Sequence, residues 1–330
     1  MKNNNELGIY IHIPFCMQKC IYCDFLSAPA GDAVKYAYTK ALINEIRNTA
    51  DGQVKDKITS IFFGGGTPSV LPDGCIADIL AAVRDCFDVL DDAEITMECN
   101  PGTVNESRLS EYRAAGVNRL SFGLQSADNN ELKMLGRIHT FEQFEESFRL
   151  ARAAGFNNIN VDLIMGLPGE DEAMIHHTLD EVKKLAPTSL TVHSLAIKRA
   201  AALNIWRDKY QAYALNNTDE IIDAAAACAA DMGMEPYYMY RQKNMAGNFE
   251  NVGYSVPGLE CIYNILIMEE KQSIVALGAG ASTKIVMPQD DGSVRIERIE
   301  NVKSVKDYIE RIDEMIERKN GDVFNYLVNN

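Results

Sequence analysis

The sequence predicts an α/β protein built around a parallel β-sheet. Six short β-like runs alternate with amphipathic helical stretches over the first 200 residues, and the runs are almost continuously apolar. Gly116 and Gly155 each follow an expected helix just before the next strand, as helix C-terminal glycines commonly do. This pattern is typical of a parallel sheet, either barrel-like or doubly wound.

The expected elements follow one another in regular order. Strands are predicted at residues 9–13, 58–63, 94–98, 118–123, 159–164 and 189–193, and helices at 33–50, 73–90, 104–115, 141–154 and 171–185. Further on, helices at 218–232 and 302–319 flank antiparallel strands at 235–241, 273–277, 282–287 and 293–298. We therefore expect a sheet unit over residues 1–200 and an α+β region over 201–330 that closes one side of the sheet.

Composition limits the class of protein. The 330 residues are 47% hydrophobic and 24% charged, which is ordinary for a globular protein, and the net charge of −15 argues against nucleic-acid binding. No apolar run approaches the roughly 18 residues that a membrane span needs, and no secretory leader is recognisable. We expect a cytoplasmic protein whose eight cysteines stay reduced.

Three of these cysteines, Cys16, Cys20 and Cys23, stand close together directly after the first expected strand. Three buried structural cysteines are one interpretation, but Gln18 and Lys19 indicate a polar loop. A structural zinc site needs four ligands and no second cysteine pair follows, while a redox dithiol needs only two cysteines. Three thiolates on a [4Fe–4S] cluster would leave one iron for a small molecule, because such clusters are usually held by four cysteines.

Other polar or glycine-rich segments follow the later strands. They are Gly64–Gly66 with Thr67 and Pro68, then Glu98 and Asn100, Gln125, Asp162 with the segment GLP at 166–168, and His193 with Ser194. In a β/α barrel the carboxyl ends of the strands meet on one face, where active sites lie. The sequence therefore predicts a site on that face, next to the cysteine loop.

At these spacings the cysteine loop resembles that of the radical S-adenosylmethionine (SAM) enzymes. The resemblance implies a partial (β/α)6 TIM-like barrel of the radical SAM type. It also implies a [4Fe–4S] cluster whose open iron is chelated by SAM, and reductive cleavage of SAM to a radical that removes hydrogen from a substrate. Cys16, Cys20 and Cys23 would be the cluster ligands.

Further motifs are similar to those of the oxygen-independent coproporphyrinogen III dehydrogenase group, which includes HemN, the haem chaperone HemW and HemZ. They are YIHIPFC (10–16), GGGTPS (64–69), ECNP (98–101), RLSFGLQ (119–125), LGRIH (135–139) and DLIMGLP (162–168). The segments at 193–201, 237–248, 260–265 and 276–280 look most like HemZ, whereas Cys23-Asp-Phe is as in HemW. HemZ proteins usually carry a sizeable region before the first barrel strand, so this sequence is either a short form or lacks that part.

The resemblance also implies residue roles. Tyr10, Gly65, Glu98 and Ala196 would contact the SAM on the open iron, and Tyr22, Gly66, Thr67, Gln125, Arg137 and Asp162 match positions for a second SAM. Tyr10, Glu98 and Arg137 would act at the reaction centre. Asp162 lies in an apolar strand, where an unpaired carboxylate is costly, so a ligand amino group or Arg137 should pair with it.

The implied reaction converts two propionates of coproporphyrinogen III to vinyl groups, with a one-electron reductant such as flavodoxin or ferredoxin as partner. An anionic tetrapyrrole should meet cations, and the candidates are Lys198-Arg199 and Arg241 with Lys243, beside Tyr237, Tyr238 and Tyr240. Solvated charges beside core tyrosines are the alternative. Two other functions stay open: a haem chaperone, and a radical SAM reaction on another substrate.

Overall fold

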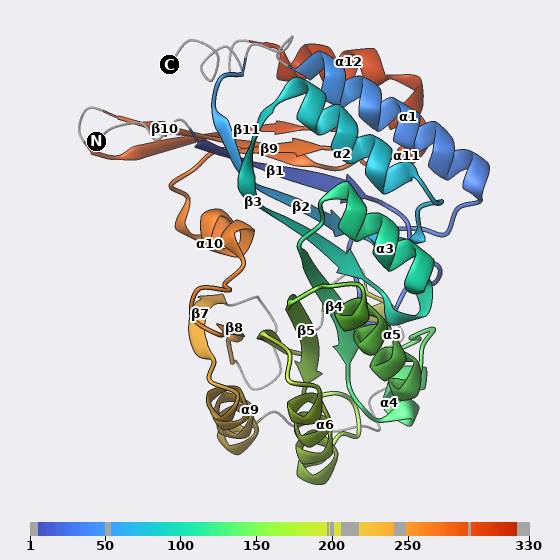
Figure 1. Ribbon diagram of the computed structural model, residues 1–330, viewed down its shortest axis with the longest axis vertical. Coiled ribbons are helices and arrows are strands. Elements are labelled where there is room, and N and C mark those ends of the chain that lie inside the picture. Colours follow the sequence, from blue (N-terminus) through green and yellow to red (C-terminus); the bar gives the residue numbers. More distant parts are fainter. Residues whose placement is uncertain are drawn as a thin grey trace.

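One curved sheet of eleven strands organises the molecule (Figure 1). The structure, a computed structural model, describes residues 6–49, 54–196, 198, 201–205, 218–240, 249–289 and 292–321. The strand order is β11-β10-β9-β1-β2-β3-β4-β5-β6-β8-β7. The central six strands are β1 (Glu6–Ile13), β2 (Lys57–Gly65), β3 (Asp88–Cys99), β4 (Arg119–Gln125), β5 (Asn158–Met165) and β6 (Ser189–Ser194). They run parallel, as predicted, and form a partial TIM-like barrel.

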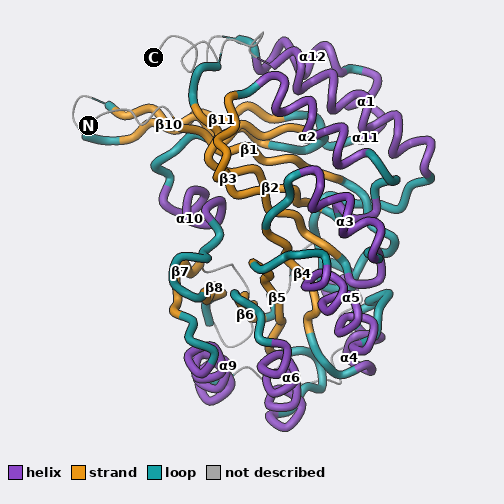
Figure 2. Tube along the Cα trace, in the orientation of Figure 1, coloured by secondary structure: helices purple, strands orange, loops and turns teal. Residues whose placement is uncertain are grey.

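Helices cover the outer face of this sheet. They are α1 (Asp32–Asn48), α2 (Cys75–Cys86), α3 (Glu106–Ala115), α4 (Asn129–Met134), α5 (Phe141–Ala153), α6 (Glu172–Leu185) and α9 (Asp219–Asp231). Figure 2 shows these helices in purple along the outside of the orange strands. Outward side chains such as Leu120, Val161 and Leu190 are fully buried against them. Each parallel strand therefore supplies one apolar face to the helical layer.

The inner faces of β4, β5 and β6 differ from the expected near-continuous apolar runs. Arg119 and Ser121 of β4, Asn160 of β5, and Ser189 and Thr191 of β6 are all buried polar residues that alternate with apolar ones. Because successive side chains of a strand point to opposite faces, this alternation makes the inside of the barrel polar. A barrel interior is usually filled with branched apolar side chains, so the polar inside indicates a site.

The C-terminal segment adds strands to both edges of the sheet. Its elements are β7 (Glu235–Tyr240), β8 (Asn251–Ser255), α10 (Ile262–Glu269), β9 (Ile274–Leu277), β10 (Ser282–Pro288), β11 (Val294–Glu300), α11 (Val305–Glu310) and α12 (Ile312–Lys319). β9 pairs with β1, and the pairing is parallel where an antiparallel strand was expected. β8 pairs antiparallel with β6 at the opposite edge.

Two further helix boundaries differ from expectation, and three short helices were not predicted. The helix expected over 73–90 ends at Cys86, because Phe87 is extended and Val89 pairs with Ile58 in the sheet. The helix expected over 302–319 is interrupted at Arg311, whose φ of −118° and ψ of 30° divide it into α11 and α12. The short helices α4, α7 (Ala202–Ile205) and α10 were not predicted. Helices this short give too few turns for a clear apolar period.

Helix α10 lies on the inner side of the sheet. It contacts both β2 and β7, which are far apart in the strand order, so it crosses the opening of the curved sheet. Tyr263 of α10 stacks on Phe62 of β2, with ring centroids 4.5 Å apart, and on Tyr10 of β1 at 5.6 Å. Offset stacking of this kind stabilises by about 0.5–1.5 kcal/mol per pair beyond burial. α10 is thus fixed as a wall of the barrel interior.

A buried ion pair ties α12 to α1. The ammonium of Lys319 contacts the carboxylate of Glu45, and both side chains are completely buried. Asn301 donates to Glu45 Oε1 at 2.7 Å, while Tyr308 Oη and the amide of Gly278 donate to Oε2. Each carboxylate oxygen therefore has partners, which is the condition under which a buried charge is tolerated.

Among the described residues, the structure contains no helix with the length and hydrophobicity to span a bilayer.

Replacing Lys319 by Met should destabilise the protein, because the Glu45 carboxylate would stay buried without its counter-charge. We expect a loss of roughly 3–5 kcal/mol of unfolding free energy in urea titrations. Lys306→Met is the matched control, since Lys306 is 78% exposed and only approaches Glu310 at 4.0 Å; exposed pairs contribute about 0–1 kcal/mol. Equal unfolding free energies for the two variants would contradict this account.

Candidate active site

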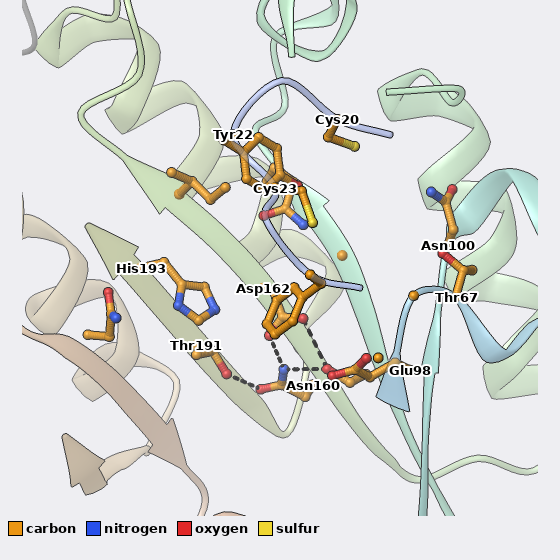
Figure 3. A pocket seen from close by; sticks show the side chains of 18 of the residues that line it. Cys20, Tyr22, Cys23, Thr67, Glu98, Asn100, Asn160, Asp162, Thr191 and His193 are labelled. Carbon is orange, nitrogen blue, oxygen red and sulfur yellow. Dashed lines mark hydrogen bonds between the residues drawn. The ribbon is translucent and has the colours of Figure 1, made fainter. Parts of the chain in front are cut away.

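A single large cavity lies inside the curve of the sheet, at the carboxyl ends of the parallel strands. Its volume is about 510 Å³, within the range of small-molecule sites. The cysteine loop, the loops after β2 and β3, the inner faces of β4 to β6, and α10 all contribute to its lining. Figure 3 shows the polar side chains that face it.

The cysteine loop is a compact turn held by backbone hydrogen bonds. Cys16 N donates to Ala28 O at 3.3 Å, and Cys23 N donates to Cys20 O at 3.2 Å. Ile21 N donates to Leu135 O at 3.0 Å, which attaches the middle of the loop to the segment after α4. All three thiols are free, half-buried and directed to the same cavity. The loop therefore presents three thiol ligands together.

The neighbours of the three thiols suit anionic sulfur ligands. Cys16 Sγ lies 3.4 Å from Thr67 Oγ1, and Arg137 Nη1 donates to Cys20 Sγ at 3.6 Å. A hydroxyl and a guanidinium beside the sulfurs suit anionic thiolates.

The glycine-rich segment after β2 packs directly on the chain that leads into the cysteine loop. Gly66 N donates to Ile13 O at 2.8 Å, and Thr67 N donates to Phe15 O at 2.7 Å. A Cβ atom at Gly66 would stand 2.5 Å from Phe15 O, a backbone atom that has no rotamer to change. Only glycine permits this approach, so Gly66 sets the distance between the two loops.

Glu98 faces the cavity at the end of β3. The pKa of its carboxyl is raised to about 8, mainly by burial and also by the charge of Asp162, while the Gly65 amide acts in the opposite direction. A cationic group bound here would restore the carboxylate form, because an opposite charge lowers the pKa of an acid. The position suits an ammonium group.

Asp162 is held by neutral partners and not by Arg137. Ser121 Oγ donates to Asp162 Oδ2 at 3.1 Å, and Asn160 Nδ2 donates to Oδ1 at 2.7 Å. Thr191 Oγ1 in turn donates to Asn160 Oδ1 at 3.1 Å, as the dashed lines in Figure 3 show. Arg137 instead donates to Gly123 O at 2.5 Å and to Cys20. The Asp162 carboxylate thus stays oriented and available to a ligand.

Most of the residues implied by resemblance meet at this cavity. Lining residues among them are Cys16, Cys20, Cys23, Tyr22, Gly65, Gly66, Thr67, Glu98, Gln125, Arg137, Asp162 and Ala196. Gln125 has a φ of 81°, a strained conformation for a side chain of its type and one that often marks a functional position. Tyr10 does not line the cavity, because its hydroxyl is hydrogen-bonded to His12 Nδ1 at 3.0 Å and its ring lies behind Tyr263.

The residues predicted to meet the substrate are only partly placed. Lys198 lines the cavity but pairs with Asp24 at 3.0 Å and lies over the Phe25 ring at 5.0 Å. Tyr238 and Tyr240 line the cavity and stack with centroids 6.2 Å apart, whereas Tyr237 is not a lining residue. Arg199, Arg241 and Lys243 lie outside the described residues.

Several lining residues were missed from sequence: Arg119, Ser121, Asn160 and Thr191 face the cavity from β4, β5 and β6. His193 of β6, which the sequence placed on this face, lines the cavity as predicted. Burial lowers the pKa of His193, although the nearby Asp162 raises it, so the imidazole is mainly neutral near pH 7. The available signal was the period-two alternation of polar and apolar residues in RLSFGLQ (119–125) and SLTVHS (189–194).

The loop after β5 is positioned by a buried acid, Glu170. Its Oε2 accepts from the amides of Gly166 and Leu167 at 2.7 and 2.9 Å. Burial raises the pKa of Glu170 to about 8, with Glu131 beside it adding to the shift. The Glu131 carboxyl is itself buried, which raises its pKa to about 7. Near pH 7 the folded protein therefore keeps Glu170 mostly protonated and Glu131 about half protonated, and both groups would lose protons on unfolding.

Comparisons with known proteins agree with this arrangement. The radical SAM superfamily pattern matches residues 10–182. The chain is 40% identical over 324 residues to the oxygen-independent coproporphyrinogen-III oxidase-like protein HemZ of Bacillus subtilis, covering 96% of this chain and 64% of that protein. It is 34% identical to the heme chaperone HemW of Escherichia coli, covering 87% of this chain and 72% of the relative.

A solved structure has a similar fold. Coproporphyrinogen III oxidase (HemN) from Escherichia coli, described as a radical SAM enzyme, matches with a TM-score of 0.75 and 23% sequence identity. The match covers 94% of this chain and 70% of that chain.

Gly66→Ala should reduce the iron bound per chain after anaerobic reconstitution, because the added Cβ would push the loop after β2 away from the cysteine loop. Gly31→Ala is the control, since nothing lies within 4 Å of a Cβ at that position. Iron analysis and the cluster absorbance measure the effect. Full iron content in Gly66→Ala would mean that the cysteine loop does not depend on this contact.

Glu170→Gln should flatten the pH dependence of stability. The folded pKa of about 8 lies above the ordinary value of a glutamate, so the stability from this group is complete at low pH and is lost as pH rises through 8. Urea unfolding at pH 5.5, 7 and 8.5 should therefore show a smaller decline for Glu170→Gln than for the unchanged protein. Glu317→Gln changes an exposed side chain and should leave the decline of the unfolding free energy with pH unchanged. If Glu170→Gln also showed the same decline as the unchanged protein, the raised pKa would not belong to Glu170.

Proposed function

Because this chain belongs to the radical SAM superfamily, within the group of HemN, HemW and HemZ, we propose that it is an oxygen-independent coproporphyrinogen III dehydrogenase. The observation that supports this most is the convergence of three free thiols, Glu98 and Asp162 on one cavity. The chain spans 64% of the length of its HemZ relative, so its substrate and partners are part of the proposal.

Each residue at the site has a role in this proposal. Cys16, Cys20 and Cys23 hold three irons of a [4Fe–4S] cluster, with Thr67 and Arg137 beside two of the sulfurs. When bound, the cluster and SAM supply one-electron chemistry that removes a hydrogen atom from an unactivated carbon. Glu98 binds the ammonium of SAM, while Gly65 and Ala196 approach it closely. A second SAM would contact Tyr22, Gly66, Gln125, Arg137 and Asp162, among the other implied positions.

The protein's own contribution is to position the substrate and to exclude water. Each of two propionates would lose one hydrogen atom, carbon dioxide and one electron to become a vinyl group, with the electron passing to an external one-electron acceptor. The paired rings of Tyr238 and Tyr240 offer a flat aromatic wall for a tetrapyrrole, with Tyr263 on α10 facing the same cavity. Tyr10 supports Tyr263 from behind and so acts on the site through it.

The wider setting follows from the same chemistry. We place the radical SAM barrel in residues 1–200 and the region that closes over the substrate in 201–330. Flavodoxin or ferredoxin would supply the electron, in the cytoplasm, where a reducing environment keeps the thiols free.

The test is turnover without oxygen. Reconstituted protein given reductant, SAM and coproporphyrinogen III should form 5′-deoxyadenosine and protoporphyrinogen IX, measured by liquid chromatography and mass spectrometry. Cys20→Ser should lose both products, whereas Cys86→Ser, a half-buried thiol on α2 outside the cavity, should keep them. Deoxyadenosine without protoporphyrinogen would exclude coproporphyrinogen III as the substrate.

A haem chaperone is the second candidate. The 34% identity to HemW supports it, as does Cys23-Asp-Phe, where Asp24 and Phe25 engage Lys198 and withdraw that cation from a substrate. Titration with haem separates the candidates: saturable binding with a shifted Soret band, and no protoporphyrinogen formed, favours the chaperone.

A further inference from the structure

The cavity extends along the inner face of β4, from the cysteine loop toward the start of the strand. Arg119, the first residue of β4, lines it together with Ser121, Gly123 and Gln125 of the same strand. At about 3.3 Å per residue, Arg119 lies ~20 Å along the strand from Gln125. The cavity therefore has two ends, one at the cysteine loop and one at Arg119.

Arg119 is a buried cation with few partners. Arg119 is 2% exposed. Its Nη2 donates to Ser189 Oγ at 3.0 Å, and its Nε has no hydrogen-bond partner. Among the described residues, no carboxylate oxygen lies within 4.0 Å of the guanidinium. The ionisable groups that face it are Cys261, Glu94, Tyr237 and Asp162.

The two nearby acids accept hydrogen bonds from other groups. Glu94 Oε2 accepts from Ile262 N at 3.1 Å, and Oε1 accepts from Cys261 Sγ at 3.3 Å, so this carboxylate caps the start of α10. Asp162 is oriented by Ser121 and Asn160. Of the five N–H groups of the Arg119 guanidinium, one donates to Ser189 and the one on Nε has no partner, so donors remain for a ligand in the cavity.

The charges of Glu94 and Asp162 favour the guanidinium form of Arg119, but neither carboxylate makes a direct ion pair with it. Among cations, arginine binds a carboxylate best, because its planar fork donates two parallel hydrogen bonds. The substrate proposed above carries four propionate carboxylates. A molecule whose carboxylate reaches Arg119 would supply the direct ion pair that the protein itself does not.

We propose that Arg119 binds one carboxylate of the substrate at the end of the cavity remote from the cysteine loop. This inference rests on the proposed function and adds a specificity determinant to it. Ligands without a carboxylate at that position would leave the cation unpaired and be rejected, which is how buried polar groups discriminate strongly. The fixed carboxylate also orients the molecule, so that a different propionate faces the SAM end.

The test compares two stable probes, coproporphyrin III and its uncharged tetra-amide. Each is titrated by fluorescence into anaerobically reconstituted protein with SAM. Arg119→Gln should weaken coproporphyrin binding about ten- to hundredfold and leave the tetra-amide nearly unchanged, as expected for loss of a charge-assisted hydrogen bond. Arg119→Lys should bind coproporphyrin with an affinity between those of the wild type and Arg119→Gln, since lysine keeps the positive charge but not the planar guanidinium that donates two parallel hydrogen bonds.

Iron content, SAM affinity and thermal stability of each variant are measured alongside. Arg152→Gln is the matched control, because Arg152 is an arginine of α5 that bonds backbone carbonyls on the outer surface. Arg152→Gln should bind coproporphyrin III in preference to the tetra-amide to the same extent as the wild type.

The outcomes are distinct. Loss of the acid preference in Arg119→Gln, with iron retained, supports the assignment. Equal weakening for both probes, or an unchanged preference, overturns it while leaving the proposed function intact. If the wild-type protein binds coproporphyrin III and the tetra-amide equally well, the assignment of Arg119 is overturned. This measurement needs no variant, so it decides the question even if the variants do not fold. Failure of wild-type protein to bind either porphyrin counts against the proposed function itself, and the carboxylate assignment falls with it.

Discussion

The close approach of Gly66 to the backbone of Ile13 and Phe15 is the contact on which the site depends. Two amide-to-carbonyl hydrogen bonds join the loop after β2 to the chain that leads into Cys16. Because neither partner is a side chain, the contact has almost no freedom to adjust. Thr67 reaches Cys16, and Gly65 reaches Glu98, only because the two loops are held at this spacing. The spacing of the two loops beside the cysteines therefore depends on the absence of a Cβ atom at Gly66.

The rest of the barrel serves a different requirement. Outward side chains of the strands make the apolar core with the helices, and inward ones make a polar interior on β4, β5 and β6. Hydrogen-bonded chains such as Thr191–Asn160–Asp162 keep that interior rigid without filling it. The aromatic stack of Tyr10, Phe62 and Tyr263 then fixes α10 across the opening. The interior of a β/α barrel is usually filled by branched apolar side chains, whereas the interior of this barrel is polar and contains a cavity.

Local signals predicted much of this. The sequence was enough to predict the cysteine loop, the glycine-rich loop and the order of the parallel strands, because each of these depends on residues that are close together in the chain. The positions of Glu98, Gln125 and Asp162 at one cavity followed from the parallel topology alone. What sequence did not show depends on distant pairing: β9 beside β1, α10 across the opening, and Glu45 paired with Lys319. Arg119 was missed because its role depends on carboxylates that are engaged elsewhere, and no local pattern reports that.

The parallel pairing of β1 with β9 also has a consequence for biogenesis. Gly8 joins Ile274, so the strand that carries the cysteine loop has a free edge until the ribosome has made most of the chain. Contacts of such long sequence separation form late and slowly. The strand before the cysteine loop therefore gains its second neighbour only near the end of synthesis, and we expect a stable iron–sulfur site only in the finished chain.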